Sequence, residues 1–225
     1  MELYIDDADT REIERLIDLY PIDGVTTNPS ILAKTGRDPK EVLGEIRQLI
    51  GENRLLFVQA VPLDAKGLVE DARKIRECFG RNTIVKIPCI PEGFKAMKQL
   101  KEEGIRTCGT VVYTPLQAYL AAKAGAEYVA PYVNRIDNMG YDGIEITKKI
   151  QNILENGGYE CKILAASFKN SGQVLSLCEY GIAAATCASE VIDQFVNNPA
   201  ITKAAEKFAE DYEKLTGRHS MKEVI

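Results

Sequence analysis

Short runs of apolar residues alternate with longer amphipathic stretches along the whole chain. The runs are rich in β-branched residues and predict strands, whereas apolar residues at helical spacing predict helices in the longer stretches. The predicted strands cover Glu2–Asp6, Gly24–Asn28, Leu55–Val61, Thr83–Pro88, Arg106–Val112, Tyr128–Tyr132, Lys162–Ser167 and Ala183–Cys187. The predicted helices cover Asp9–Leu19, a region ending at Ile50, Ala65–Cys78, Glu92–Glu103, Thr114–Ala124, Gly143–Glu155, Ser171–Tyr180 and Ser189–Asn197. A strand followed by a helix is therefore predicted about eight times.

The strands are continuous apolar runs, which is typical of a parallel sheet covered by helices. About eight such units in 225 residues favour a closed (β/α)₈ TIM barrel, because an open doubly wound sheet usually has fewer strands. No Pro-, Gly- or Ser-rich linker interrupts the chain, so we expect a single domain over residues 1–225. Ile201–Leu215 predicts an additional C-terminal amphipathic helix, which would either cap the barrel or contact a neighbouring subunit.

Composition and charge narrow the functional classes. The chain has 28 Lys and Arg against 33 Asp and Glu, a net charge of −5, which argues against a nucleic-acid partner or an anionic membrane surface. Neither a signal peptide nor an apolar run of the roughly 18 residues needed to span a bilayer is present, so a cytoplasmic location is expected. The single histidine, His219, lies in a polar tail, which leaves little material for a Ser-His-Asp, Cys-His or His-zinc site.

Two further patterns exclude other kinds of site. The sequence has no Gly-Lys-Ser/Thr motif and no Gly-x-Gly-x-x-Gly after a strand, so neither a P-loop nor a dinucleotide fingerprint is predicted. The six cysteines contain no Cys-x-x-Cys pair, and most lie in or beside apolar runs. We expect them to be reduced structural thiols.

Each predicted inward strand face ends in a polar residue. In a TIM barrel, side chains alternate between the interior and the helix layer, and the chemistry gathers at the carboxyl ends of the strands. The predicted inward pairs are Tyr4 and Asp6, Thr26 and Asn28, Phe57 and Gln59, Ile84 and Lys86, Cys108 and Thr110, Ala130 and Tyr132, and Ala165 and Ser167. Together these ends predict a concave polar pocket.

Lys86 stands in an otherwise apolar strand, Thr83–Pro88. An ammonium group there loses hydration, so its pKa should fall and its amine should become nucleophilic. One interpretation is a lysine that forms a Schiff base with a substrate carbonyl. The alternative is a strand-end lysine that reaches solvent or pairs with Asp6.

The other polar ends also allow two interpretations each. Asp6 either moves protons for the substrate or neutralises the lysine, and Tyr132 is either a proton donor or a packing residue. Gln59 is a hydrogen-bond scaffold or a satisfied core amide. Asn28 precedes Pro29, so a turn and helix-cap role competes with substrate binding. Arg135 is a phosphate ligand together with Ser167, or a surface ion pair.

Four segments resemble the transaldolase family, and in particular its short fructose-6-phosphate aldolase branch. They are Gly24–Ser30 (GVTTNPS), Val85–Pro88 (VKIP), Ala130–Asp137 (APYVNRID) and Leu164–Lys169 (LAASFK). They occur in register over essentially the whole chain. The resemblance implies a (β/α)₈ barrel and class I aldolase chemistry without metal or other cofactor.

The resemblance also implies residue roles. Lys86 would be the Schiff-base lysine, with Asp6 handling hydroxyls and protons. Thr110 and Gln59 would position a catalytic water. The substrate-binding residues would be Thr26, Asn28, Arg135 and Ser167, the last two near the phosphate.

Two positions favour the aldolase branch over true transaldolases. The family pattern has Gln at position 59 and Tyr at position 132 in aldolases, against Glu and Phe in transaldolases, and this chain has Gln59 and Tyr132. Tyr132 can deliver a proton through water to a dihydroxyacetone enamine, which would make the net reaction a cleavage. The expected reaction is reversible cleavage of fructose 6-phosphate to dihydroxyacetone and glyceraldehyde 3-phosphate.

Two alternatives to that reaction remain open. One is a transaldolase that passes the dihydroxyacetone unit from fructose 6-phosphate or sedoheptulose 7-phosphate to an aldose phosphate in the pentose phosphate pathway. The other is a barrel of this lineage that serves only as a binding or scaffold protein. The resemblance further implies a homo-oligomer, a decamer of two pentamers, in which the last helix reaches a neighbour.

Overall fold

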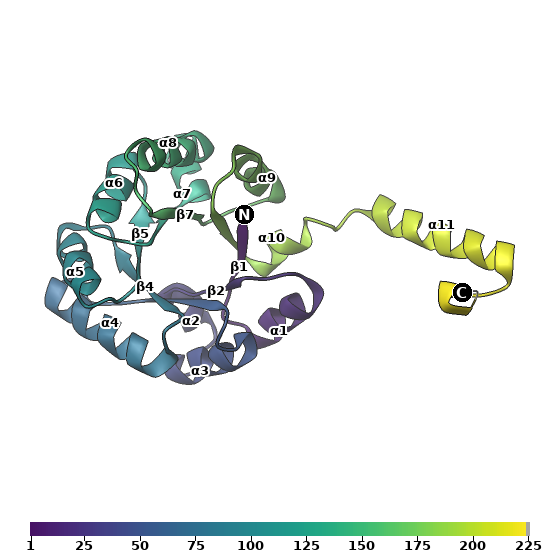
Figure 1. The fold of residues 1–225 in the computed structure, drawn as a ribbon, viewed down its shortest axis with the longest axis horizontal. Coiled ribbons are helices and arrows are strands. Elements are labelled where there is room, and N and C mark those ends of the chain that lie inside the picture. Colours follow the sequence, from purple (N-terminus) through teal and green to yellow (C-terminus); the bar gives the residue numbers. More distant parts are fainter. Residues whose placement is uncertain (224–225) are drawn as a thin grey trace.

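Eight parallel strands close into a barrel in chain order. A computed structural model describes residues 1–223, and in it β1 pairs with β8 to complete the ring (Figure 1). The strands are β1 (Glu2–Asp6), β2 (Gly24–Thr26), β3 (Leu55–Gln59), β4 (Thr83–Pro88), β5 (Thr107–Val112), β6 (Tyr128–Pro131), β7 (Lys162–Ala165) and β8 (Ala184–Cys187). The barrel prediction is confirmed. Several strands end before the predicted residue; Asn28, for example, caps the helix that follows β2 instead of pairing in the sheet.

Helices surround this barrel, and one further helix leaves it (Figure 1). They are α1 (Thr10–Leu19), α2 (Pro29–Lys34), α3 (Pro39–Ile50), α4 (Ala65–Phe79), α5 (Pro91–Glu102), α6 (Pro115–Lys123), α7 (Val133–Asp137), α8 (Gly143–Asn156), α9 (Ser171–Tyr180), α10 (Ser189–Asp193) and α11 (Pro199–Thr216), followed by a 3₁₀ turn at Met221–Glu223. The predicted alternation is thus observed. The short helix α7, which directly follows β6, was not predicted.

A cap residue followed by proline starts several of these helices. Asn28, Asp38, Thr114 and Asn198 each accept a hydrogen bond from the first turn, and proline follows each of them. A polar cap satisfies an amide that has no helical partner, and proline at the first helical position needs no such partner. These pairs fix where the chain turns from a strand or loop into a helix.

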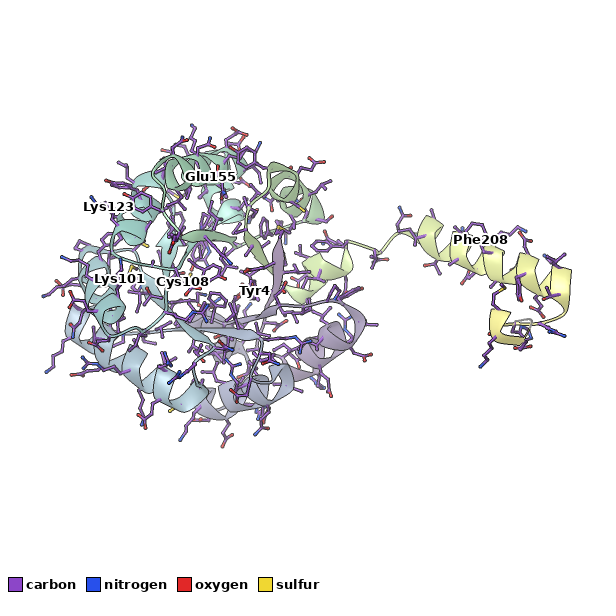
Figure 2. The ribbon with its side chains drawn as sticks, viewed as in Figure 1. Tyr4, Lys101, Cys108, Lys123, Glu155 and Phe208 are labelled. Carbon is purple, nitrogen blue, oxygen red and sulfur yellow. The ribbon has the colours of Figure 1, made fainter. Side chains whose placement is uncertain are left out.

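The core is divided between the barrel interior and the layer under the helices. The interior cluster contains Tyr4, Phe57, Ile84, Cys108 and Tyr128, and Figure 2 shows Tyr4 and Cys108 within the ring. The two clusters between strands and helices are built from the alternate strand residues and the apolar faces of the helices. This division confirms the inward position predicted for Tyr4, Phe57, Ile84, Cys108, Ala130 and Tyr132.

Aromatic rings fill the amino-terminal end of the barrel, and hydrogen bonds to Glu2 link its strands. The rings of Tyr4, Phe57 and Tyr128 pack edge to face with centroids 5.2 and 5.3 Å apart. The Glu2 carboxylate accepts hydrogen bonds from the Tyr4 and Tyr128 hydroxyls at 2.8 and 3.0 Å and from Lys162 Nζ at 2.8 Å. Aromatic packing therefore supports the floor of the space at the opposite end.

The predicted phase of β7 is wrong by one residue. Ala165 packs in the layer beneath the helices, whereas Leu164 and Ala166 face the interior. Ser167, predicted to share a face with Ala165, lies beyond the end of β7 in a left-handed conformation with φ 61°. Alanine fits either layer, so the short run Leu164–Ala166 carries little information about which face turns inward.

The last helix, α11, stands away from the barrel. Figure 1 shows it extended to one side, and Figure 2 shows Phe208 on it far from the barrel side chains. None of its residues is buried, and Phe208 and Leu215 are 74% and 82% exposed. The predicted helix is therefore confirmed, but it does not cap its own barrel. Within residues 1–223, no helix has both the length and the apolar character required to cross a bilayer.

The cysteines match the expectation of reduced thiols. All six are free, and Cys89, Cys108 and Cys187 are buried. Burial raises the pKa of the Cys108 and Cys187 thiols to about 12, so these side chains stay neutral at physiological pH. Cys78 and Cys178 are exposed.

Candidate active site

A cavity of about 830 Å³ lies over the carboxyl ends of the strands. Asp6, Thr26 and Lys86 line it at the ends of β1, β2 and β4, and Thr186 does so from β8. Of the other predicted site residues, Asn28, Tyr132, Arg135 and Ser167 also line this cavity. The predicted polar pocket is present at the end of the barrel where chemistry gathers in this fold.

Lys86 is held inside the barrel wall. Its side chain is 5% exposed, and its Nζ donates a hydrogen bond to the backbone carbonyl of Thr27 at 2.8 Å. No other charged residue among residues 1–223 is as little exposed to solvent. The solvent-reaching alternative is wrong, because the amine is buried beside the cavity and is held by the carbonyl of Thr27, which directly follows β2.

Asp6 lies beside this lysine in a hydroxyl-lined corner. Burial raises the pKa of the Asp6 carboxyl, while the nearby charge of Lys86 and the hydrogen bond from Thr26 oppose the rise. Thr26 Oγ1 donates to Asp6 Oδ1 at 2.7 Å and lies 2.6 Å from Thr186 Oγ1. The corner thus combines an acid that accepts protons readily with an amine facing the same cavity.

A bulge in β5 brings Thr110 next to Tyr132. Gly109 pairs with Val129 and Val112 with Pro131, so two residues of β5 lie opposite one residue of β6. Val111 takes a left-handed φ of 59° at this point, which is unusual for a β-branched residue. The Thr110 and Tyr132 hydroxyls lie 2.8 Å apart, so a bulge directly after Gly109 supports the hydroxyl pair.

Tyr132 also supports the arginine of the site. The Arg135 guanidinium stacks over the Tyr132 ring at 4.6 Å from its centroid, and the Tyr113 ring packs on its edge at 5.7 Å. Within residues 1–223, Arg135 stacks on this ring rather than pairing with a carboxylate, so the surface ion-pair interpretation is not supported. Its donors and Ser167 line the same cavity.

Asn28 lines the cavity, whereas Gln59 lies beside a residue that lines it. The Asn28 side chain caps α2 by accepting from the Ile31 amide at 3.0 Å, which confirms the turn interpretation, and it lines the cavity as well. Gln59 pairs in register with Lys86 at the end of β3 and is partly buried. Neither Gln59 nor Thr110 is among the residues that line the cavity, but each lies next to a residue that does, Lys86 and Tyr132 respectively.

Sequence reasoning missed part of this site. The predicted inward pairs do not include the last strand, although Thr186 lies two residues after Ala184 and so shares its inward face. The cavity also reaches Arg11, Lys34 and Arg37, which belong to the loops and helices after β1 and β2. Arg37 is paired with Glu45, so this wall is partly neutralised.

Comparison with known proteins agrees with this geometry. A mandelate oxidase variant carrying a monooxide FMN adduct superposes with a TM-score of 0.56 at 12% identity, over 83% of this chain and 63% of that one. The chain therefore spans under two thirds of that protein, and the likeness at this identity concerns the barrel fold alone. The profile of a family described as transaldolase/fructose-6-phosphate aldolase matches residues 3–224. With nearly its whole length matched and a buried strand lysine facing the cavity, the chain belongs to the transaldolase/fructose-6-phosphate aldolase family.

Proposed function

We propose that this protein is a class I aldolase that cleaves fructose 6-phosphate reversibly to dihydroxyacetone and glyceraldehyde 3-phosphate. The observation that carries the proposal is the buried amine of Lys86, which faces a cavity shared with Asp6 and Tyr132. A buried amine that is fixed in place and open to a cavity is suited to attack a carbonyl carbon. The family match supports sugar phosphates as the substrate class.

The proposed reaction begins with attack of Lys86 Nζ on the C2 carbonyl of the substrate. Loss of water gives a protonated imine. Asp6 takes the proton of the C4 hydroxyl as the C3–C4 bond breaks, and the bond electrons pass through C3 to the iminium nitrogen. Glyceraldehyde 3-phosphate leaves with its new C4 carbonyl, and the dihydroxyacetone unit stays on the lysine as an enamine.

Release of the second product requires a proton at C3. Tyr132 delivers it through a water, and hydrolysis of the imine then frees dihydroxyacetone and regenerates Lys86. Thr110, 2.8 Å from the Tyr132 hydroxyl, and Gln59, next to Lys86 in register, position this water. Thr26 and Asn28 bind substrate hydroxyls, and Arg135 with Ser167 binds the phosphate.

The alternative activity is a transaldolase, which uses the same lysine but passes the enamine to an aldose phosphate such as erythrose 4-phosphate. Gln59 favours the aldolase, because an amide cannot act as the acid or base that a carboxylate at this position would provide. Tyr132 favours it for the opposite reason, since its hydroxyl can donate a proton.

The proposal extends to assembly and location. We infer a ring-shaped homo-oligomer, a decamer of two pentamers, in which α11 packs on a neighbouring copy. This inference is supported by the apolar side chains of Phe208 and Leu215, which are exposed on a helix that has no buried residue. We place the enzyme in the cytoplasm, where charged sugar phosphates are retained.

Borohydride trapping tests the lysine directly. Wild-type protein incubated with fructose 6-phosphate and borohydride should gain the mass of a reduced sugar adduct, and Lys86→Met should gain none. Lys66→Met is the matched control, because that lysine is 86% exposed and should leave the adduct unchanged. An absence of adduct on the wild type would overturn the aldolase and the transaldolase alike and leave a binding role.

An acceptor-free assay separates the two enzymes. Steady release of glyceraldehyde 3-phosphate from fructose 6-phosphate alone supports the aldolase. Release that starts only after erythrose 4-phosphate is added would mean that the enamine waits for an acceptor, and the protein would then be a transaldolase.

A further inference from the structure

Thr186 lies in the active site, and the reaction proposed above gives it no role. Its side chain is 3% exposed and lines the cavity together with Asp6 and Thr26. Its Oγ1 is 2.6 Å from Thr26 Oγ1, which in turn donates to Asp6 Oδ1 at 2.7 Å. Side chains from β8, β2 and β1 therefore form one continuous hydrogen-bonded chain that ends on the carboxylate.

The direction of this chain follows from the number of protons available. A threonine hydroxyl carries one proton, and an ionised carboxylate can only accept. While Asp6 is ionised, Thr26 must donate its hydroxyl proton to Asp6, so Thr186 must donate to Thr26. When Asp6 takes a proton on Oδ1, each hydroxyl can turn and the chain can run the other way. The same three positions thus satisfy both charge states of the acid without moving a heavy atom.

We propose that Thr186 is a positioning residue of the Schiff-base reaction, which acts through Thr26 to orient the Asp6 carboxylate for taking up the substrate proton. This inference rests on the proposed roles of Lys86 and Asp6. Thr186 does not contact Asp6 itself. Because Thr186 lines the cavity, a substrate hydroxyl or a water can donate to one of its two lone pairs and so join the chain.

The surroundings of Asp6 explain why a remote donor matters. The charged and titratable groups that face it are Lys86 from β4, Arg135 from α7, the adjacent Asp7, and Cys187 from β8. Burial raises the pKa of the Asp6 carboxyl, and Asp7 adds to the rise, while Lys86, Thr26 and Arg135 oppose it. The Cys187 thiol, with a pKa raised to about 12, stays neutral over the range of an assay. Within residues 1–223 the hydrogen bond donated to the Asp6 carboxylate by a side chain comes from Thr26, so a change in the support of that donor should be measurable.

Two variants of the full-length protein test the proposal. Thr186→Val keeps the shape of the side chain but removes the hydroxyl, whereas Thr186→Ser keeps the hydroxyl. We expect Thr186→Val to lower kcat for acceptor-free cleavage about tenfold with little change in KM, as for the loss of one hydrogen bond that acts on a charge. The acidic limb of its pH profile should move to higher pH, because the ionised carboxylate loses support. Thr186→Ser should behave as wild type.

A double variant shows whether the two threonines act in series. If Thr186 works only through Thr26, adding Thr186→Val to Thr26→Val should cost no further activity, within about twofold. A double variant that loses the product of the two single losses would overturn the proposal. So would a Thr186→Val pH profile that superposes on that of the wild type, or a Thr186→Ser variant as slow as Thr186→Val.

A measurement without substrate separates this inference from the proposed function. Isotope-edited infrared titration of Asp6 in the free protein should show a higher midpoint in Thr186→Val than in wild type. An unchanged midpoint would overturn the inference whatever the activity, whereas the absence of a borohydride adduct on the wild type would overturn the proposed function. If Thr186→Val does not unfold cooperatively on heating, Thr186→Ala carries the same comparison.

Discussion

Replacing Tyr132 with phenylalanine separates the chemistry of its hydroxyl from the packing of its ring. The ring is buried, with Arg135 stacked 4.6 Å from its centroid and Tyr113 on its edge. Phenylalanine preserves this packing. The substitution removes only the hydroxyl and its hydrogen bond of 2.8 Å to Thr110.

The two roles predict effects of different size. Thr110 is fully buried, so leaving its hydroxyl without a partner should cost about 1–2 kcal/mol of stability. For a chain of this length that lowers the Tm by about 2–8 °C. A proton donor in a transition state contributes about 10²–10⁴ in rate, equivalent to about 3–5 kcal/mol. If Tyr132 protonates the enamine, the increase in the activation free energy should therefore exceed the decrease in the free energy of unfolding.

The assay follows release of dihydroxyacetone and glyceraldehyde 3-phosphate from fructose 6-phosphate without an acceptor. In Tyr132→Phe we expect release to fall about 100-fold, while borohydride still traps the adduct and transfer to erythrose 4-phosphate continues. Tyr128→Phe is the control, because that hydroxyl contacts Glu2 at the opposite end of the barrel. Acceptor-free turnover of Tyr132→Phe within about threefold of wild type would refute the role of proton donor and leave a packing residue.

Three further outcomes follow from the structure. Gly24→Ala should destabilise the barrel by more than about 3 kcal/mol in denaturant titrations, because a Cβ there would lie 2.0 Å from the Leu55 carbonyl oxygen, whereas Gly44→Ala, with open space around it, should be neutral or stabilising. Asp6→Asn should be more stable than wild type at pH 7, because a raised pKa of Asp6 in the folded state means that ionisation of this carboxyl opposes folding. This advantage should disappear as the pH falls below the ordinary aspartate value of 3.8. Equal stability of the two proteins at pH 7 would contradict the prediction. Removal of residues 201–225 should leave cooperative unfolding but reduce the sedimentation coefficient, and an unchanged sedimentation profile would exclude α11 as an assembly element.

The parts of the fold that depend on burial were predictable from the sequence. Strand starts follow from apolar, β-branched runs, and the structure has them within one residue of prediction in β1 to β8. Lys86 stood out because a charged residue in such a run must have a compensating environment. The cavity was predictable for the same reason, since polar residues recurred at successive strand ends.

Other parts depended on information that a residue pattern does not carry. The phase of β7 was wrong because Ala165 and Ala166 fit either side of the sheet equally well. The β5 bulge inserts one residue before Val112, and only the pairing partner reveals it. The link between Thr186 and Asp6 joins the last strand to the first, so it exists only once the barrel closes.

The position of α11 illustrates a different limit. Its amphipathic pattern was clear, but the pattern is the same whether the apolar face meets its own barrel or another chain. The helix leaves the barrel with Phe208 and Leu215 exposed. The sequence therefore predicted the helix and not its position relative to the barrel.

The long-range hydrogen bonds to Glu2 have a consequence for folding during synthesis. Its partners Tyr128 and Lys162 follow it by 126 and 160 positions, so the Glu2 carboxylate is neutralised only after β6 and β7 have been made. Contacts of such sequence separation are slow to form, because a long loop must close first. A nascent chain that stalls before β7 therefore exposes an open sheet edge at β1 and an acid without its lysine. The bonds from Tyr128 and Lys162 to Glu2 therefore report that β6 and β7 have joined the sheet, one strand before β8 closes the ring.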